Sequence, residues 1–129
     1  MLDAAIVEML ARDASLEPLG IEVVSASEGE AVAEMTITSQ MANGHGICHG
    51  GIVFALADTA FACAANSVAR DVVTADAGIT YLAPTRVGVR LRAKARVALH
   101  QGRSVIVDVV VRDGERAVAV YRASGRSTR

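Results

Sequence analysis

The sequence predicts an α+β fold in which a curved antiparallel sheet wraps around one long central helix. Two observations predict it. A nearly uninterrupted apolar run over residues 50–69 is the only segment long and apolar enough to form a central helix. Several shorter runs on both sides of it alternate between apolar and polar residues, as half-buried strands do. Because a sheet must cover its apolar face, this helix is the expected cover.

The segment before the central helix predicts one outer helix and one hairpin. Apolar residues recur at helical spacing over residues 2–12, and this helical region is expected to end near Pro18-Leu19-Gly20. Two strand-like runs at residues 21–26 and 31–38 flank a Ser-Glu-Gly-Glu turn. The expected order up to the central helix is therefore helix, strand, strand.

Four strands are expected after the central helix. They cover residues 72–82, 89–99, 104–112 and 117–124. In the second of them, apolar residues alternate with basic ones, which predicts one buried face and one basic face. The basic positions are Arg90, Arg92, Lys94 and Arg96. The last three strands are expected to form an antiparallel meander.

The composition predicts a core of small side chains and limits the possible partners. The chain of 129 residues is 52% hydrophobic but has only two Phe, two Tyr and no Trp, so Ala and Val must fill the interior. Residues 1–85 hold 2 basic and 11 acidic residues, whereas residues 86–129 hold 11 basic and 3 acidic ones. This asymmetry favours a polyanionic small molecule or self-association over nucleic acid.

Cysteine content and hydropathy predict a cytoplasmic protein. Cys48 and Cys63 occur in a chain without a secretory leader, which indicates reduced thiols. The apolar run at residues 50–69 approaches the length of a membrane span, but it contains Asp58 and several other polar residues. We therefore expect a buried helix and no membrane partner.

The loop at residues 43–51, which reads NGHGICHGG, leads directly into the central helix and is the strongest candidate for chemistry. A helix that begins at Gly50-Gly51 offers unpaired amides and a partial positive charge to a carbonyl oxygen or an anion. Asp58 is the only charged residue inside this helix, and a carboxylate among apolar side chains is costly to desolvate unless a partner stabilises it. The alternative for the glycines alone is a tight turn.

The spacing of Gly51 and Asp58 predicts a site shared between two chains. Seven residues correspond to about 700° of helical rotation and ~10.5 Å along the axis, so both residues lie on one stripe but cannot touch the same carbonyl. Two copies of the helix, antiparallel across a two-fold axis, would bring Asp58 of one copy to Gly51 of the other. Ala55, Ala62 and Ala65 on this stripe would permit close packing.

The loop NGHGICHGG, the helix segment LADTAFA at residues 56–62 and the following Asn66-Ser67 resemble the PaaI-type acyl-CoA thioesterases of phenylacetate degradation. The resemblance implies a single hotdog domain over residues 1–129 that assembles as a homotetramer, a dimer of dimers. It implies hydrolysis of a CoA thioester with an aryl-acetyl or hydroxylated phenylacetyl group. Coenzyme A is part of the substrate, and neither a metal nor a separate cofactor is expected. The chain departs from the family at Ala83, where an arginine is common.

The resemblance also implies roles for four catalytic residues. Asp58 would act as a general base on water or as a nucleophile that forms a mixed anhydride, and the sequence leaves both routes open. The Gly51 N–H would stabilise the oxyanion. Asn43 would position water or the carboxylate, although it can also be a turn former beside Gly44. His49 would support the loop and the carbonyl contact, or simply bond the backbone.

Further residues are expected to contact the substrate. Gly50 and Thr59 lie beside the catalytic positions, although Thr59 can also serve helix packing. Phe54 and Phe61 would suit a flat ring. Arg90 and Arg103 would bind the phosphates of coenzyme A, unless the basic stripe is only a solvated sheet face.

Three rival functions use the same residues. A metal enzyme has suitable ligand types, but the glycines of the loop argue against a shared helical face for them. The ligand types are His45, Cys48, His49 and Asp58. A thiol nucleophile at Cys48 would need His49 as its base, and adjacent side chains seldom point together. A non-catalytic acyl-CoA-binding module or a hotdog dehydratase would use the same scaffold.

Overall fold

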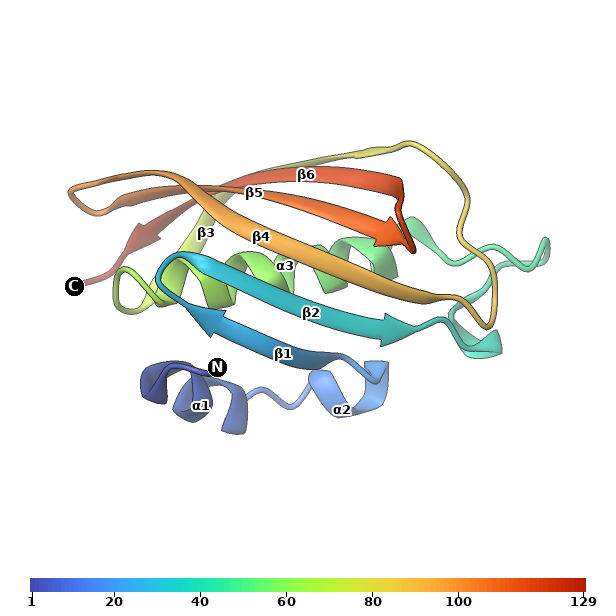
Figure 1. Ribbon diagram of the computed structural model, residues 1–129, viewed down its shortest axis with the longest axis horizontal. Helices are drawn as coiled ribbons and strands as arrows, with labels where there is room; N and C mark the ends of the chain where they lie inside the picture. Colours follow the sequence, from blue (N-terminus) through green and yellow to red (C-terminus); the bar gives the residue numbers. More distant parts are fainter.

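The chain forms a six-stranded antiparallel sheet that curves around one long helix (Figure 1). The computed structural model describes all of residues 1–129. The central helix α3 spans Gly50–Asn66, and the strand order is β1-β2-β4-β5-β6-β3. The strands are β1 (Glu22–Ser27), β2 (Glu30–Thr36), β3 (Val72–Tyr81), β4 (Arg90–Gln101), β5 (Ser104–Asp113) and β6 (Arg116–Ser127). The predicted α+β class and the predicted order of the main elements are confirmed.

The predicted N-terminal helical region is two short helices, which lie outside the sheet beside β1 (Figure 1). They are α1 (Ala4–Ala11) and α2 (Leu16–Leu19). The break between them forms because the Asp13 carboxylate accepts hydrogen bonds from the Ser15 N–H at 2.9 Å and the Ser15 hydroxyl at 2.5 Å. Such local side-chain bonds compete with the helix. Gly20 ends α2 with a φ of 66°, where glycine is favoured.

The core between α3 and the sheet consists mainly of Ala and Val, as the composition predicts. Inward positions alternate along β4 and β5 and are almost fully buried. These positions are Leu91, Ala93, Ala95, Val105, Val107, Val109 and Val111. The largest buried side chain of α3, Phe61, fits because Gly125 of β6 has no side chain: a Cβ there would lie 3.0 Å from the Phe61 ring and 2.4 Å from Val72.

The outer face of the sheet joins the acidic and basic parts of the sequence. In the register of β2 and β4, Glu34 lies opposite Arg92 and Glu30 opposite Arg96. Arg90 forms ion pairs with Glu34 at 3.1 Å and with Glu22 of β1 at 3.0 Å. Exposed pairs of this kind add little stability. Arg90 and Arg92 of the basic stripe are therefore paired with carboxylates of the same chain.

Strand β3 lies at one edge of the sheet and pairs with β6 alone. Its position beside β6, rather than beside β4, which follows it in sequence, was not predictable from the periodicity. Val73 and Tyr81 of β3 are exposed large apolar side chains, at 55% and 48% exposure. None of the helices is both long enough and apolar enough to cross a membrane.

Candidate active site

The loop before α3 is shaped by Asn43. Its Oδ1 accepts hydrogen bonds from the N–H groups of His45 at 2.9 Å and Ile47 at 3.2 Å. Gly46 follows with a φ of 72°, a left-handed conformation that glycine adopts without strain. Asn43 therefore acts as the turn former that the sequence offered as one alternative. Its contact with water or with the catalytic carboxylate stays a prediction.

Helix α3 begins at Gly50, as predicted, and its first turn is open to a ligand. His49 is the N-cap, its side chain is exposed and makes no capping bond, and its carbonyl accepts from Ile52 and Val53. The first-turn amides of Gly50 and Gly51 consequently have no acceptor within the helix. Gly51 is exposed, and nothing lies within 4 Å of the point where its Cβ would be, so the space beside this residue is open.

Tyr81 of β3 fixes the start of the helix, and sequence reasoning missed it. Its hydroxyl donates to the Gly50 carbonyl at 2.6 Å, and a Cβ on Gly50 would lie 2.8 Å from the Tyr81 ring. A side chain at position 50 would therefore displace the Tyr81 ring from this contact. An apolar pocket of about 390 Å³ lies beside this contact. Its lining includes Ile47, Cys48, Val53, Leu82, Ala83 and Val118.

Asp58 lies half-buried on α3, and its partner is Tyr121 of β6. The Tyr121 hydroxyl donates to Asp58 Oδ1 at 2.7 Å. Tyr121 is only 3% exposed, and its ring packs edge-on against Phe54 with the centroids 5.2 Å apart. Burial, together with the hydrogen bond to Asp58 and its charge, raises the pKa of Tyr121 well above the ordinary value. The phenol therefore stays protonated and supplies the stabilising partner that a carboxylate in this apolar helix requires.

The other predicted contacts on α3 have different surroundings. Phe54 is half-buried next to Tyr121, whereas Phe61 is 1% exposed and lies in the core. The Thr59 hydroxyl donates to the Ala55 carbonyl of its own helix at 2.8 Å. This bond favours the packing role for Thr59. Of the two aromatic side chains on α3, Phe54 is thus the one that is partly exposed, as Asp58 is.

The predicted cations do not converge on the helix start of their own chain. Arg90 donates to Glu34, Glu22 and Thr36 on the outer face of the sheet. Arg103 lies in the β4–β5 turn, at the end of the molecule opposite to the start of α3 (Figure 1). Their contact with coenzyme A stays a prediction that a single chain does not test.

The thiol and metal alternatives gain no support from the geometry. Cys48 is 5% exposed and donates to the His49 carbonyl at 3.5 Å. Burial raises the pKa of the Cys48 thiol, with a partly opposing hydrogen bond to Thr85, so the nucleophilic thiolate is disfavoured. No three His, Cys, Asp or Glu side chains lie close enough together to hold a metal ion. Cys63 is likewise buried and unpaired.

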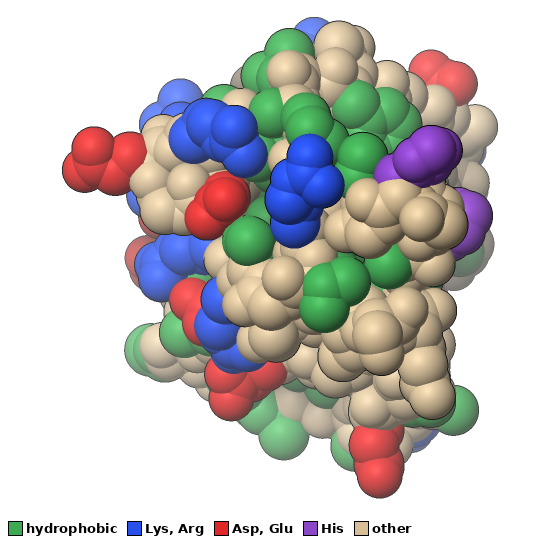
Figure 2. All heavy atoms as spheres, turned by 90° about the vertical axis from the view of Figure 1, so that its right-hand side faces the viewer, with side chains coloured by type: hydrophobic (Ala, Val, Ile, Leu, Met, Phe, Trp, Pro, Cys, Tyr) green, Lys and Arg blue, Asp and Glu red, His purple; other side chains and the backbone are tan.

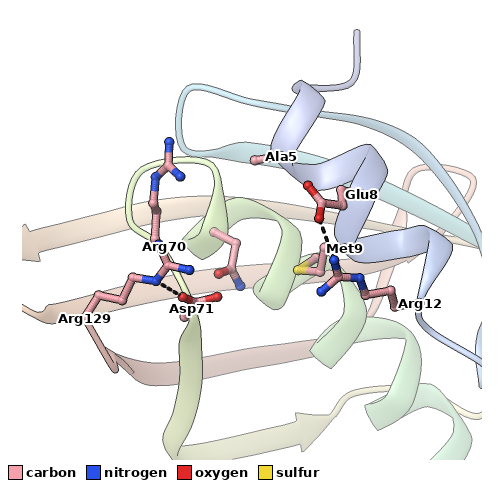
Figure 3. A pocket seen from close by; sticks show the side chains of 8 residues that line it. Ala5, Glu8, Met9, Arg12, Arg70, Asp71 and Arg129 are labelled. Carbon is pink, nitrogen blue, oxygen red and sulfur yellow. Dashed lines mark hydrogen bonds and ion pairs between the residues drawn. The ribbon is translucent and has the colours of Figure 1, made fainter.

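The two ends of α3 differ in their surface. Figure 2 views the molecule from the end where α3 begins and shows histidine side chains beside hydrophobic ones, with basic and acidic side chains gathered on the opposite side of the view. A polar cavity of about 390 Å³ lies at the other end of α3, between α1 and the C-terminus (Figure 3). Its cations Arg12 and Arg129 are already paired with Glu8 and Asp71. The third cation of this cavity, Arg70, forms no ion pair with a carboxylate.

Comparison with known proteins assigns the family. The family model described as Thioesterase superfamily matches residues 45–120, from the Gly-rich loop into β6. The chain belongs to the thioesterase superfamily. It is 44% identical over 123 residues to the acyl-coenzyme A thioesterase PaaI of Escherichia coli K12, covering 94% of this chain and 86% of that protein.

Solved structures of similar fold agree with this assignment. The structure of the E. coli PaaI protein from the phenylacetic acid degradation operon matches with a TM-score of 0.94 and 37% identity, covering 97% of this chain and 91% of that one. A Streptococcus mutans UA159 protein, smu.793, solved with bound acetyl CoA, matches with a TM-score of 0.80 and 26% identity, covering 84% and 88%. The hotdog fold, the resemblance to PaaI-type acyl-CoA thioesterases and the prediction of a thioester hydrolase are confirmed.

The part matched by the thioesterase model contains most of the candidate site. His49, Gly51 and Asp58 lie inside residues 45–120, whereas Asn43 precedes them. Tyr121, the hydrogen-bond partner of Asp58, follows the matched residues directly. The residue that donates a hydrogen bond to the Asp58 carboxylate therefore lies just outside the family match.

Proposed function

We propose that this thioesterase hydrolyses acyl-CoA thioesters with Asp58 of one chain and the Gly51 amide of a second chain. The observation that carries the proposal is that both groups lie on the side of α3 left uncovered by its own sheet. Asp58 is half-buried there and Gly51 is exposed, whereas the residues between them that face the sheet are fully buried. The seven-residue spacing, ~10.5 Å along the axis, prevents both groups of one chain from acting on one carbonyl.

Two features of the surface support a two-fold partner. The uncovered side of α3 carries small side chains at Ala55 and Ala62, which permit close approach of a second helix, whereas Ala65, expected on the same stripe, is buried in the core. Strand β3 has a free edge with the apolar side chains of Val73 and Tyr81 exposed, and such an edge is suited to extension of the sheet by a second copy. An antiparallel pair of chains would produce two equivalent sites, and two such dimers would form the expected tetramer.

The net reaction forms a bond from the carbonyl carbon to the oxygen of water and breaks the C–S bond. The Gly51 N–H donates to the thioester oxygen and stabilises the charge that develops on it. Asp58 either removes a proton from the attacking water or attacks the carbon itself to form a mixed anhydride that water then opens. In both routes the C–S bond breaks and coenzyme A leaves as the thiol. His49 and Asn43 support the loop that carries the amide.

The substrate class follows from similarity and from the apolar surroundings. The E. coli relative belongs to a phenylacetic acid degradation operon, which favours an aryl-acetyl or hydroxylated phenylacetyl group. Phe54, half-buried beside Asp58, offers an aromatic surface to such a ring. Arg90 and Arg103 remain the proposed contacts for the nucleotide, and the cytoplasmic location stays a prediction from the two thiols.

Replacement of the acid tests the proposed function. Asp58→Asn should lower kcat by about a hundredfold or more while the affinity for acyl-CoA is largely retained, because the change removes the base or nucleophile but keeps the shape. Steady-state release of free thiol from phenylacetyl-CoA, hydroxyphenylacetyl-CoA and short aliphatic acyl-CoAs measures both activity and preference. Undiminished cleavage by the variant would contradict the role of Asp58, and a preference for the aliphatic esters would contradict the aryl-acetyl assignment.

A further inference from the structure

We propose that Tyr121 is a positioning residue for the reaction: its hydroxyl holds one oxygen of the Asp58 carboxylate, so that the other oxygen faces the reacting carbonyl or water. The inference rests on the proposed role of Asp58 and assigns a function to a residue outside the matched thioesterase region. Tyr121 does not touch the substrate in this proposal. It acts only through Asp58.

The surroundings of Tyr121 hold its hydroxyl in place. Tyr121 is an inward position of β6, and its inward neighbours Ala119 and Ala123 are small and buried. The Tyr121 ring packs edge-on against Phe54, with the ring centroids 5.2 Å apart, and lies tilted against Phe61, with the centroids 6.2 Å apart. A buried aromatic ring with two packed neighbours has little freedom to rotate. The phenol oxygen is therefore held at one position beside α3.

The hydrogen bond divides the two carboxylate oxygens of Asp58. Oδ1 accepts from Tyr121 at 2.7 Å, a length typical of a hydroxyl that donates to an ionised acceptor. The other oxygen, Oδ2, has no donor within the chain. Because burial and the charge of Asp58 raise the pKa of Tyr121, the phenol remains a donor throughout the neutral range. One oxygen is thus held and the other is available for chemistry.

The consequence is an effect on turnover rather than on binding. Without the phenol, the carboxylate can rotate about its terminal torsion and loses its one intrachain hydrogen bond on an apolar helix face. A misplaced catalytic oxygen slows the chemical step. Binding of coenzyme A is expected to persist, since Tyr121 is buried behind Asp58 and offers no surface to the ligand.

The test is Tyr121→Phe, which removes the hydroxyl and keeps the ring between Phe54 and Phe61. We expect kcat for thiol release to fall about tenfold or more with KM changed by less than about twofold. In an Asp58→Asn background the same change should lower kcat by less than about twofold, because the catalytic carboxylate oxygen that Tyr121 positions is already absent. Ser127→Ala, on the same strand as Tyr121, is the matched control. It removes a 2.6 Å hydrogen bond that the Ser127 hydroxyl donates to the Arg70 carbonyl, and kcat should not change.

Each outcome decides between the two proposals. Loss of activity in Asp58→Asn with normal kcat in Tyr121→Phe would overturn the positioning role and leave the proposed function intact. An equal loss from Tyr121→Phe in both backgrounds would show a general packing defect and would also overturn it. Full activity of Asp58→Asn would remove the proposed function and this inference with it.

Discussion

The two faces of helix α3 differ in how deeply their side chains are buried. The face toward the sheet carries Leu56, Ala60 and Ala64, all of them completely buried. The other face carries Gly51, which is exposed, and Asp58, which is half-buried. Both faces belong to the same 17 residues and are separated only by the rotation of the helix. One face therefore supplies folding energy, while the other is left uncovered for a partner and a substrate.

The two faces are not independent, because one side chain connects them. Tyr121 belongs to the sheet and packs with the core residue Phe61, yet its hydroxyl bonds to Asp58 on the uncovered side. A polar group at the end of an apolar ring can serve both environments at once. This arrangement lets a charged residue lie on a helix whose remaining interior is apolar.

The largest expected effect on the buried face is from Leu56→Ala. The side chain is completely buried, so its loss leaves a cavity and should destabilise the fold by about 2–5 kcal/mol. The kcat of the folded protein should stay within about twofold of the wild type. Urea unfolding followed by circular dichroism, together with thiol release below the unfolding transition, measures both quantities.

This result would be the reverse of that for Asp58→Asn, which should lose turnover and keep most of its stability. If Leu56→Ala lost turnover in proportion to its stability, the two faces of α3 would not be separable. If Asp58→Asn unfolded the protein, the acid would be structural before it is catalytic.

A smaller effect is expected from pH, again on the buried face. Burial, and to a lesser extent the charge of Asp13, raises the pKa of Cys63 to about 12. The folded state thus holds the thiol proton more tightly than the unfolded chain does, so this contribution to stability is complete below pH 9 and declines as the pH rises toward 12. The free energy of unfolding should fall between pH 9 and 10, where Cys48 contributes in the same direction because its pKa is also raised, and before Tyr121 begins to contribute.

Cys63→Ala provides the control for this pH dependence. The variant loses some packing at every pH, but its stability should be flatter between pH 9 and 10 because no thiol titrates in the unfolded chain at that position. A slope equal to that of the wild type would show that another group is responsible.

The sequence was sufficient for the framework because the framework depends on local patterns. Alternation over residues 89–99 predicts the inward and outward faces of β4, and the glycine pair predicts the start of α3 at Gly50. The position of β3 beside β6 is a long-range pairing, which no local pattern encodes. The break between α1 and α2 depends on one Asp13 side chain that bonds to the next turn.

The candidate site was predictable only in part. Asp58 and Gly51 are visible in the sequence as a charge and a glycine in an apolar segment, whereas Tyr81 and Tyr121 act across the fold from β3 and β6. A signal for Tyr121 does exist. It occupies an inward strand position, where a hydroxyl needs a partner, and the unpaired acid of the central helix needs a donor. Matching these two requirements would have predicted the bond.

The sharing of one site between two chains can be tested by subunit complementation. Asp58→Asn lacks the acid, and Gly51→Pro lacks the amide hydrogen, whose loss should cost about a hundredfold in kcat while proline is tolerated in the first helical turn. Each variant alone should be nearly inactive. A mixed dimer of the two has one site with both defects and one site with neither.

Co-refolding equal amounts of the two variants should therefore restore thiol release to about a quarter of the wild-type rate, since about half of the dimers are mixed and each has one intact site. The double variant, mixed with either single one, should restore nothing. The expected result is recovery of about a quarter of the wild-type rate of thiol release. A mixture no more active than its separate components would show that the acid and the amide act within one chain, and would contradict it.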